Sequence, residues 1–224
     1  MKKVPRIVIL GPQGGGKGTQ ADRLARRWHI PHISTGQLLR DEMARGTSLG
    51  QRITTTMNRG RLIPVRLTNE VMRRRLSQPD CRLGWICDGY PRNMAQARPF
   101  ARFGRPNVLI VLHLLDQAAV RRLAGRRVCP QGHVYHLRYD PPKKRRGYCD
   151  RDGLRLWQRD DDTPSAIRQR LRIYHRETAP VLRWFRKRVM IISVEARWPI
   201  PTVYRHLLSQ LKRIPWLSSR LQQK

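Results

Sequence analysis

The feature that most constrains this chain is the stretch Arg6–Gln20, which reads RIVILGPQGGGKGTQ. The apolar run Ile7–Leu10 predicts a buried strand, and a helical pattern begins near Gly16. The turn between them places Gly11 five residues before Gly16 and directly follows it with Lys17, which is the spacing of a loop that wraps a polyphosphate. Glycines let backbone N–H groups turn toward the phosphates, and the lysine adds a mobile positive charge. The chain is therefore predicted to bind a nucleotide.

Length and composition set the limits for the rest of the chain. Its 224 residues are enough for one domain core that carries small inserts. No apolar run approaches the roughly 20 residues of a membrane span. The first strand follows two lysines without the apolar segment of a signal peptide. We therefore expect a cytoplasmic protein that does not enter a membrane.

The charge balance is unusual, because 47 lysines and arginines face 15 acidic residues and give a formal net charge of +32. Such a field attracts polyanions whatever the fold. One interpretation is a specific association with nucleic acid or the ribosome, and the other is an arginine-rich surface on an enzyme whose ligands are polyanions. The basic residues are spread along the chain and accompany no nucleic-acid-binding module, which favours the second interpretation. Non-specific nucleic-acid association is expected from the charge alone.

The phosphate loop and two later motifs resemble those of one enzyme family. The loop GPQGGGKGTQ, Gly11–Gln20, resembles that of the adenylate kinase family, in which Lys-Gly-Thr-Gln replaces the usual Lys-Ser/Thr. STGQLLR at Ser34–Arg40 and DGYPR at Asp88–Arg92, with Gln96 after it, follow in the family's order and spacing. The resemblance covers roughly Arg6–Leu211. It implies reversible transfer of the γ-phosphoryl group of Mg·ATP to AMP, giving two ADP, by an enzyme that acts as a monomer.

The alternation of strand and helix patterns indicates an α/β fold with a parallel sheet. Strands are expected at Ile7–Leu10, His32–Ser34, from Gly84, at Val108–Leu114 and at Val189–Val194. The resemblance implies a P-loop three-layer α/β/α fold with a five-stranded sheet in the order 2-3-1-4-5. It also implies a core formed by residues 1–33, 64–124 and 163–224, an AMP-binding insert at 34–63 and a lid insert at 125–162. The tail after Ile214 extends past this pattern, and nothing in it predicts a role.

The resemblance assigns roles to single residues around ATP. It implies an ATP site formed by Gly11, Gln13, Gly14, Gly15, Gly16, Lys17, Gly18, Thr19, Arg122, Arg126, Val134, Tyr135 and Trp198. The catalytic residues it implies are Lys17, Asp88, Arg92, Arg126, Arg159 and Arg170. Asp88 would hold Mg²⁺, directly or through water, because a carboxylate at the carboxyl end of a strand faces the phosphate loop. No general base is needed, since the acceptor oxygen is already anionic.

The AMP site implied by the resemblance consists of Thr35, Gly36, Arg40, Arg61, Leu62, Ile63, Gly89, Arg92, Gln96, Arg159 and Arg170. Arg92 can donate two N–H bonds to one phosphate. The amide of Gln96 offers both a donor and an acceptor to an adenine edge. Thr35 favours AMP as the acceptor, because pyrimidine nucleotide kinases that resemble this family usually carry alanine there.

Two alternative functions stay open. The first is transfer within another nucleotide pair, such as GTP with AMP or a pair with UMP or CMP as acceptor, because the donor base is contacted mainly by backbone groups. The second is a catalytically weak member of the fold that associates with RNA or another polyanion. Two departures from the family pattern, Gln37 for an aspartate and Val65–Leu67 for a segment with an acidic residue, affect helix capping and insert docking more than chemistry.

Four cysteines, at positions 81, 87, 129 and 149, do not form a secreted disulfide framework. Zinc-bearing lids in the family show Cys-x2-Cys followed by Cys-x2-Cys or Cys-x2-Asp, and Cys149-x2-Asp152 matches the second pair. The first pair is replaced by Cys129-x3-His133, which could still supply a sulfur and an imidazole nitrogen to a structural Zn²⁺. A hydrogen-bonded cluster without metal and a reversible disulfide between Cys129 and Cys149 are the two alternatives.

Overall fold

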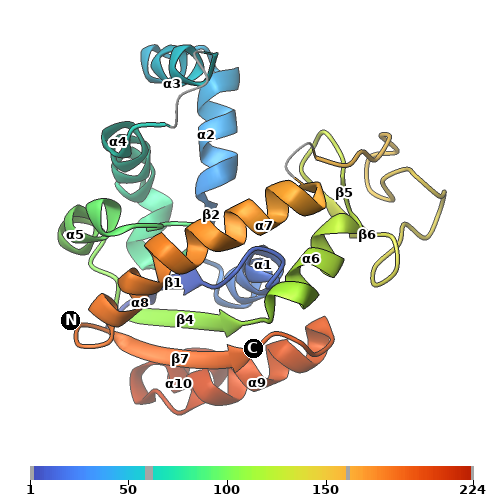
Figure 1. Cartoon of the computed structure of the whole chain (residues 1–224). Helices are drawn as coiled ribbons and strands as arrows, with labels where there is room; N and C mark the ends of the chain where they lie inside the picture. Colours follow the sequence, from blue (N-terminus) through green and yellow to red (C-terminus); the bar gives the residue numbers. More distant parts are fainter. Residues whose placement is uncertain (1–2, 59–62, 160–161, 223–224) are drawn as a thin grey trace.

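The computed structural model describes residues 3–58, 63–159 and 162–222. Its central sheet is parallel and has five strands in the order β2-β3-β1-β4-β7 (Figure 1). These strands are β1 (Arg6–Leu10), β2 (His32–Ser34), β3 (Trp85–Asp88), β4 (Val108–His113) and β7 (Met190–Glu195). A small antiparallel sheet pairs β5 (Arg126–Val128) with β6 (Val134–His136). The fold class and the strand order predicted from the sequence are confirmed, with β7 as the fifth strand.

The apolar run of β1 explains why this strand lies at the centre of the sheet. Successive side chains of Ile7–Leu10 enter alternate faces, and none is more than 2 % exposed. Ile7 lies in register with Ile86 of β3 on one side and with Val108 of β4 on the other. A strand that is covered on both faces needs apolar residues at every position, not at every second one. The run therefore fixes both the position of β1 and the three-layer arrangement.

The helices cover the two faces of the sheet in separate groups (Figure 1). One face packs against α1, α9 and α10, and the other packs against α4, α5 and α8. The helices are α1 (Lys17–Trp28), α2 (Thr35–Ala44), α3 (Ser48–Asn58), α4 (Val65–Leu76), α5 (Met94–Phe103), α6 (Asp116–Ala124), α7 (Pro164–Ile173), α8 (Ala179–Phe185), α9 (Ile200–Lys212) and α10 (Pro215–Gln222). A 3₁₀-helix spans Pro79–Leu83, and a π-helical turn at Tyr174–Thr178 joins α7 to α8. No described helix is both long and apolar enough to span a bilayer.

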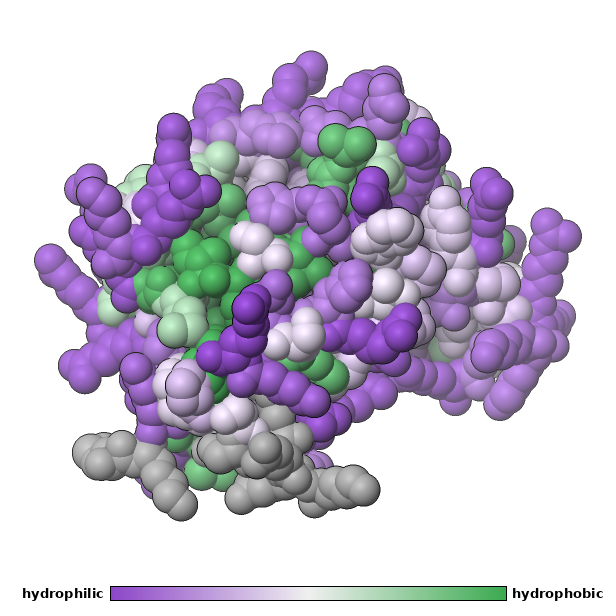
Figure 2. All heavy atoms as spheres, turned by 90° about the horizontal axis from the view of Figure 1, so that it is seen from below, coloured by the Kyte–Doolittle hydropathy of each residue, from purple (hydrophilic) through white to green (hydrophobic). Residues whose placement is uncertain are grey.

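The tail after Ile214 forms α10 and belongs to the core. Leu217 has no exposed surface and lies in the same apolar cluster as Leu211 of α9 and Trp28 of α1. The Nζ of Lys3 lies 5.4 Å from the ring centroid of Trp216. Figure 2 shows the side of the molecule that carries these helices, where an apolar area is framed by projecting hydrophilic side chains. The tail therefore closes the apolar layer on this face of the sheet.

Two parts of the chain project away from the three layers (Figure 1). The first holds α2 and α3, whose apolar residues Leu49 and Ile53 form a separate cluster with Leu67 and Val71 of α4. The second holds β5, β6 and the loops after them, and has its own small cluster of Cys129, Tyr135, Cys149 and Leu156. Each projection thus has apolar contacts of its own, apart from the two large clusters on the sheet.

Candidate active site

The phosphate loop joins the end of β1 to the start of α1. Gly11, Gly14 and Gly16 have φ values of 151°, 78° and 77°, which side chains other than glycine rarely adopt. A Cβ on Gly11 would lie 2.5 Å from the carbonyl oxygen of Leu112, so the loop also approaches β4 too closely for any other residue. The loop thus turns its backbone around the first N–H groups of α1, as phosphate binding requires.

Lys17 lies at the end of this loop. Its Nζ donates to the carbonyl oxygens of Gly11 at 3.0 Å and Pro12 at 2.9 Å. Burial of the ammonium group lowers the pKa of Lys17 to about 8, and the nearby carboxylate of Asp88 partly opposes this change. Further lowering of this pKa comes from the positive charges of Arg92, Arg170 and Arg126. The structure therefore gathers five of the six predicted catalytic residues within electrostatic reach of one another.

Asp88 is the last residue of β3 and lies beside the phosphate loop. Its Oδ1 is buried and has no hydrogen-bond partner among the residues that the structure describes. A Cβ built on Gly18 would lie 3.5 Å from its Oδ2, so the start of α1 and the carboxylate are near neighbours. A buried carboxylate oxygen without a partner is costly. It fits a site for Mg²⁺ or for a water on that ion.

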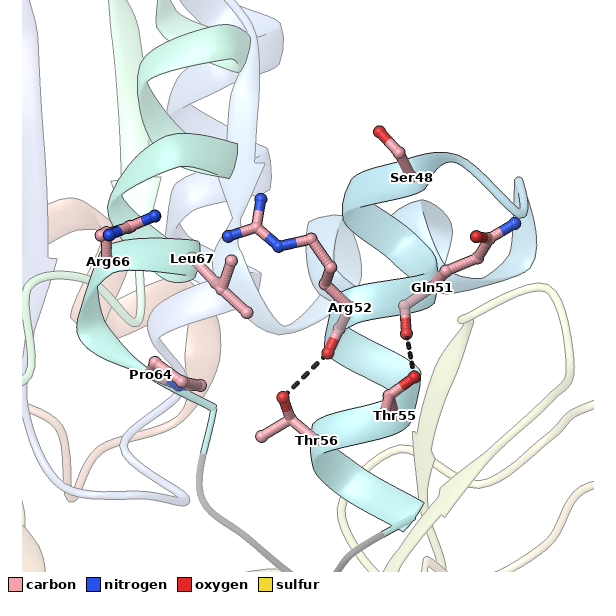
Figure 3. Close-up of a pocket in the computed structure, with 8 residues that line it drawn as sticks. All are labelled: Ser48, Gln51, Arg52, Thr55, Thr56, Pro64, Arg66 and Leu67. Atoms are coloured by element: carbon pink, nitrogen blue, oxygen red, sulfur yellow. Dashed lines mark hydrogen bonds between the residues drawn. The ribbon is translucent and has the colours of Figure 1, made fainter.

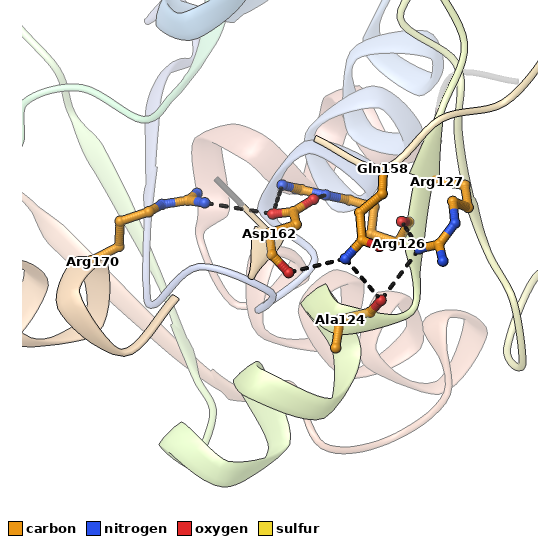
Figure 4. Close-up of polar contacts among 6 residues, drawn as sticks. All are labelled: Ala124, Arg126, Arg127, Gln158, Asp162 and Arg170. Atoms are coloured by element: carbon orange, nitrogen blue, oxygen red, sulfur yellow. Dashed lines mark hydrogen bonds and ion pairs between the residues drawn. The ribbon is translucent and has the colours of Figure 1, made fainter. Parts of the chain in front are cut away.

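The arginines on either side of the lid meet at Asp162 (Figure 4). Arg126 donates from Nε and Nη2 to the two carboxylate oxygens at 2.8 and 2.6 Å. Arg170 of α7 approaches Oδ1 at 3.5 Å, and the side chain of Asp162 has no exposed surface. Gln158 donates to the carbonyl oxygen of Asp162 at 3.1 Å, and the N–H of Asp162 donates to the carbonyl of Arg159 at 3.0 Å. From the sequence, Asp162 was only the last residue of the expected lid insert, and this role was missed.

The predicted AMP side is built around α2. Thr35, which is 3 % exposed, donates from Oγ1 to the carbonyl oxygen of Asp88 at 3.3 Å. Arg40 donates to Oε1 of Gln37 at 2.6 Å, and Gln37 donates to Asp41 at 2.7 Å. Gln37, which departs from the family pattern, thus bonds both to Arg40, a predicted phosphate ligand, and to Asp41, one helical turn after Gln37. Of the predicted backbone contacts, Ile63 packs on the α3–α4 cluster, whereas Arg61 and Leu62 lie outside the described residues.

Arg92 follows the turn after β3 and is held by its own neighbours. Its Nε donates to the carbonyl oxygen of Gly89 at 2.8 Å, and its backbone N–H donates to Oε1 of Gln96 at 2.7 Å. Gly89 has a φ of 80°, and a Cβ there would lie 3.3 Å from the Arg92 guanidinium. Gln96 in turn donates its backbone N–H to Oδ1 of Asn93, the N-cap of α5, at 3.0 Å. Since the Gln96 oxygen has a second lone pair, its amide can still offer a donor and an acceptor to a ligand.

Two of the residues predicted for the ATP site, Arg122 and Trp198, lie near the start of α9, whereas Val134 and Tyr135 lie in β6. Arg122 donates to the carbonyl of Arg197 at 3.0 Å, and Trp198 is 43 % exposed with the Arg197 guanidinium 4.6 Å from its ring centroid. Val134 of β6 is exposed. The side chain of Tyr135 instead supports the lid, because its hydroxyl accepts the N–H of Asp150 at 2.8 Å.

Four side chains in the lid converge as a metal site would require. The ligand atoms of Cys129, His133, Cys149 and Asp152 all lie within 4.8 Å of one another. The Nδ1 of His133 lies 3.3 Å from each sulfur and 2.9 Å from Oδ2 of Asp152. Tetrahedral Zn²⁺ with bonds of about 2.0–2.3 Å separates its ligand atoms by roughly 3.3–3.8 Å, so the set fits with small shifts. The two cysteines are not bonded to each other.

A groove between α3 and α4 has no part in this arrangement (Figure 3). It is lined by Ser48, Gln51, Arg52, Thr55, Thr56, Pro64, Arg66 and Leu67, none of which is a predicted site residue. Thr55 and Thr56 donate their hydroxyls to carbonyls of their own helix at 2.8 Å. Arg52 lies 3.6 Å from Glu70. The polar groups of the groove are thus largely satisfied within the protein.

Comparisons with known proteins agree with the geometry. A family model described as adenylate kinase matches residues 9–190. An adenylate kinase of Streptomyces coelicolor is 42 % identical over 215 residues, which cover 93 % of this chain and 99 % of that protein. An adenylate kinase of Anaeromyxobacter sp. is 44 % identical over 84 % of this chain and 91 % of its own length. One from Archaeoglobus fulgidus is 37 % identical over 93 % of this chain and 98 % of its own length.

Proposed function

This chain belongs to the adenylate kinase family, and on that premise we propose how its residues divide the work of the reaction. The enzyme catalyses reversible transfer of the γ-phosphoryl group of ATP to AMP, giving two ADP. The observation that carries the proposal is the gathering of Lys17, Asp88 and three arginines at the end of the phosphate loop. This arrangement supplies charge and alignment but no general base, and an anionic acceptor oxygen needs none.

The ATP phosphates would lie in the loop Gly11–Thr19, where Lys17 exchanges its two carbonyl contacts for phosphate oxygens. Arg126 and Arg170 already hold an anion, the carboxylate of Asp162, and the transferred phosphoryl group would offer them a second. Arg159 would join them from the border of the lid. Mg²⁺ carried by ATP would neutralise charge on the phosphates, and Asp88 would hold the ion directly or through a water.

AMP would lie between α2 and the turn after β3. Arg40 and Arg92 would hold its phosphate. The Nε of Arg92 donates to the carbonyl of Gly89, so its terminal guanidinium nitrogens would contact the phosphate. Thr35 and Gln96 would meet the adenine, with backbone groups around Arg61–Ile63 completing the pocket. We propose residues 34–63 and 125–162 as the two inserts that close over the nucleotides and exclude water, which would otherwise accept the phosphoryl group.

The lid cluster of Cys129, His133, Cys149 and Asp152 is proposed to hold Zn²⁺ in a structural role. Its four ligand atoms complete a tetrahedral set, so no coordination position is left to activate water. Two sulfurs and an imidazole suit zinc better than magnesium. The ion would fix the loops of a lid whose apolar cluster contains few residues.

A coupled assay of the purified chain tests the choice of nucleotides. ADP formation is measured with ATP and AMP, with GTP in place of ATP, and with CMP or UMP in place of AMP, and zinc is determined on the same sample. We expect ATP and AMP to be the best pair and about one zinc per chain. Faster transfer with GTP, or to CMP or UMP, would replace the proposed substrates. Absence of zinc in freshly purified protein would overturn the lid proposal.

A secondary property, salt-sensitive association with nucleic acid, is proposed from one hollow on the surface. Lys3, Arg186, Lys187 and Arg188 line it beside Trp216, and none of the described residues that line it is acidic. Since the positive charge is also spread over the whole chain, we expect binding to RNA or heparin at low salt. This binding should be lost before the salt concentration reaches about 0.5 M. Retention at higher salt would indicate a specific nucleic-acid site instead. A cytoplasmic monomer remains our proposal for location and assembly.

A further inference from the structure

Both ends of the Arg92 backbone unit are held by side chains. Its N–H donates to Gln96 four residues later, and its carbonyl oxygen accepts the hydroxyl of Thr178 at 2.7 Å. The second bond joins positions 86 residues apart in the chain, and Thr178 is only 6 % exposed. A hydroxyl–carbonyl bond whose donor is buried links distant segments more firmly than a fully exposed one, because water competes with it less.

The location of Thr178 makes this bond unusual. Thr178 ends the π-helical turn and directly precedes α8, and its own backbone is helical, with φ −90° and ψ −32°, so the helix continues through it. In the structure its side chain caps no N–H of α8. Pro180, the second residue of α8, has no N–H to offer. The hydroxyl is therefore available to bond outside its own helix, and it reaches Arg92.

The π-helical turn connects this bond to the lid. Tyr174–Thr178 continues directly from α7, the helix that leaves the lid and carries Arg170 (Figure 1). Such turns are rare in helices, cost stability and occur often at functional sites, where the extra residue changes the direction of the side chains that follow. Here the turn lies between the arginine that contacts Asp162 and the threonine that contacts Arg92.

We propose that Thr178 is a positioning residue for the AMP phosphate. Its hydroxyl anchors the carbonyl of Arg92, so that the guanidinium is presented in one orientation and the peptide is fixed relative to the helix that returns from the lid. The proposal rests on the role of Arg92 in the proposed function. It assigns Thr178 no contact with either nucleotide.

Steady-state kinetics of two Thr178 variants in the full chain test the proposal. Thr178→Val keeps the shape and removes the hydroxyl, and we expect it to raise KM for AMP about tenfold while KM for ATP stays within about twofold. Thr178→Ser keeps the hydroxyl and should restore KM for AMP to within about twofold of the parent. Ser209→Ala is the matched control, because it removes an exposed hydroxyl bond of 2.8 Å to the carbonyl of His206 on α9. It should change neither KM.

A double-mutant cycle separates this proposal from the role of Arg92 itself. If Thr178 acts through Arg92, adding Thr178→Val to Arg92→Ala should not weaken AMP further. A wild-type KM for AMP in Thr178→Val, an equal rise in both KM values, failure of Thr178→Ser to restore AMP affinity, or additivity in the cycle would each overturn the proposal. If Arg92→Ala alone leaves the affinity for AMP unchanged, it is the proposed function of Arg92 that fails. Thermal midpoints of all variants identify any general loss of folding.

Discussion

Arg92, one of the two arginines proposed for the AMP phosphate, is held in a different way from the arginines proposed for the transferred phosphoryl group. Arg92 is fixed by three hydrogen bonds with neutral groups, two of which involve its backbone. Arg126 and Arg170 instead share the buried carboxylate of Asp162 at the edge of the lid. The first arrangement belongs to the folded core, and the second depends on an ion pair between segments on either side of the lid.

The two arrangements respond differently to an incoming phosphate. The two bonds of the Arg92 backbone do not compete with the ligand, and the carbonyl of Gly89 occupies only Nε of the guanidinium, so its terminal nitrogens can still bind AMP. A carboxylate does compete, because it and a phosphate are both anions that bind a guanidinium in a bidentate manner. We infer that the AMP side is preorganised, whereas the lid side exchanges one anion for another as the lid moves.

The largest expected effect comes from removing the side chain of Arg92, which lies on the preorganised AMP side. Arg92→Ala should lower turnover by about two orders of magnitude or more while the chain stays folded, because the acceptor phosphate loses its alignment. The measurement is kcat with ATP and AMP, together with a thermal midpoint. Arg98→Ala, which removes an exposed arginine of α5, is the control and should retain normal turnover. Near-normal turnover in a folded Arg92→Ala protein would contradict the assigned role.

Removing the charge of Asp162 at the edge of the lid should have a smaller effect on kcat and a clear effect on the free energy of unfolding. Asp162→Asn removes the charge that orients two arginines, and we expect kcat to fall about tenfold and the free energy of unfolding to fall by about 1–3 kcal/mol. Chemical denaturation and kcat are the measurements. Asp140→Asn, at an exposed lid position, is the matched control. An unchanged or higher kcat would mean that Asp162 restrains the arginines without orienting them.

The pH dependence should distinguish the ATP side from the AMP side. Burial lowers the pKa of Lys17 to about 8, so the enzyme without nucleotide loses this charge above pH 8. We expect kcat/KM for ATP to fall about fivefold between pH 8 and 9, with a weaker change in kcat/KM for AMP. The unfolded chain holds the Lys17 proton up to its ordinary pKa of 10.5, so this group makes the free energy of unfolding rise between pH 8 and 10.5. Equal pH profiles for the two substrates would contradict this account.

The smallest effect is expected from removing the zinc that we propose for the lid. Chelation of zinc should loosen the loops that carry Cys129 and Cys149 and raise KM for ATP about threefold, with little change in KM for AMP. Thermal unfolding should lose a few degrees, and added Zn²⁺ should restore both values. If chelation raised KM for AMP more than KM for ATP, the expected influence of the lid on ATP binding would be contradicted.

The parts that sequence could predict are those whose chemistry is contiguous in the chain. The loop Gly11–Lys17 and the turn Asp88–Arg92 each carry a complete local signal, and the strand order followed from the family that these motifs resemble. The role of Asp162 depends on contact with Arg126, 36 residues away, and that of Thr178 on contact with Arg92. Neither contact leaves a pattern in the local sequence, because threonine beside a helix and aspartate in a loop have ordinary local uses.

The packing of the tail could not be predicted for a different physical reason. Its apolar residues are few, and α10 gains its position from tertiary packing, not from a strong helical pattern of its own. The place where a polyanion binds could not be predicted either. A net charge of +32 predicts attraction to polyanions without saying where on the surface they bind. The extents of the two closing inserts and the individual ligand contacts stay predictions that the experiments above address.

The burial of Leu217 has a practical consequence for anyone who shortens or tags this protein. A chain trimmed to the length that the family pattern suggests would lack α10 and would bare Leu207 and Leu211, which are both fully buried. Such a product would expose an apolar surface on α9 and be prone to self-association, although every residue proposed for catalysis would still be present. Purification tags on this enzyme are safer when a flexible spacer follows Lys224 than when they replace α10.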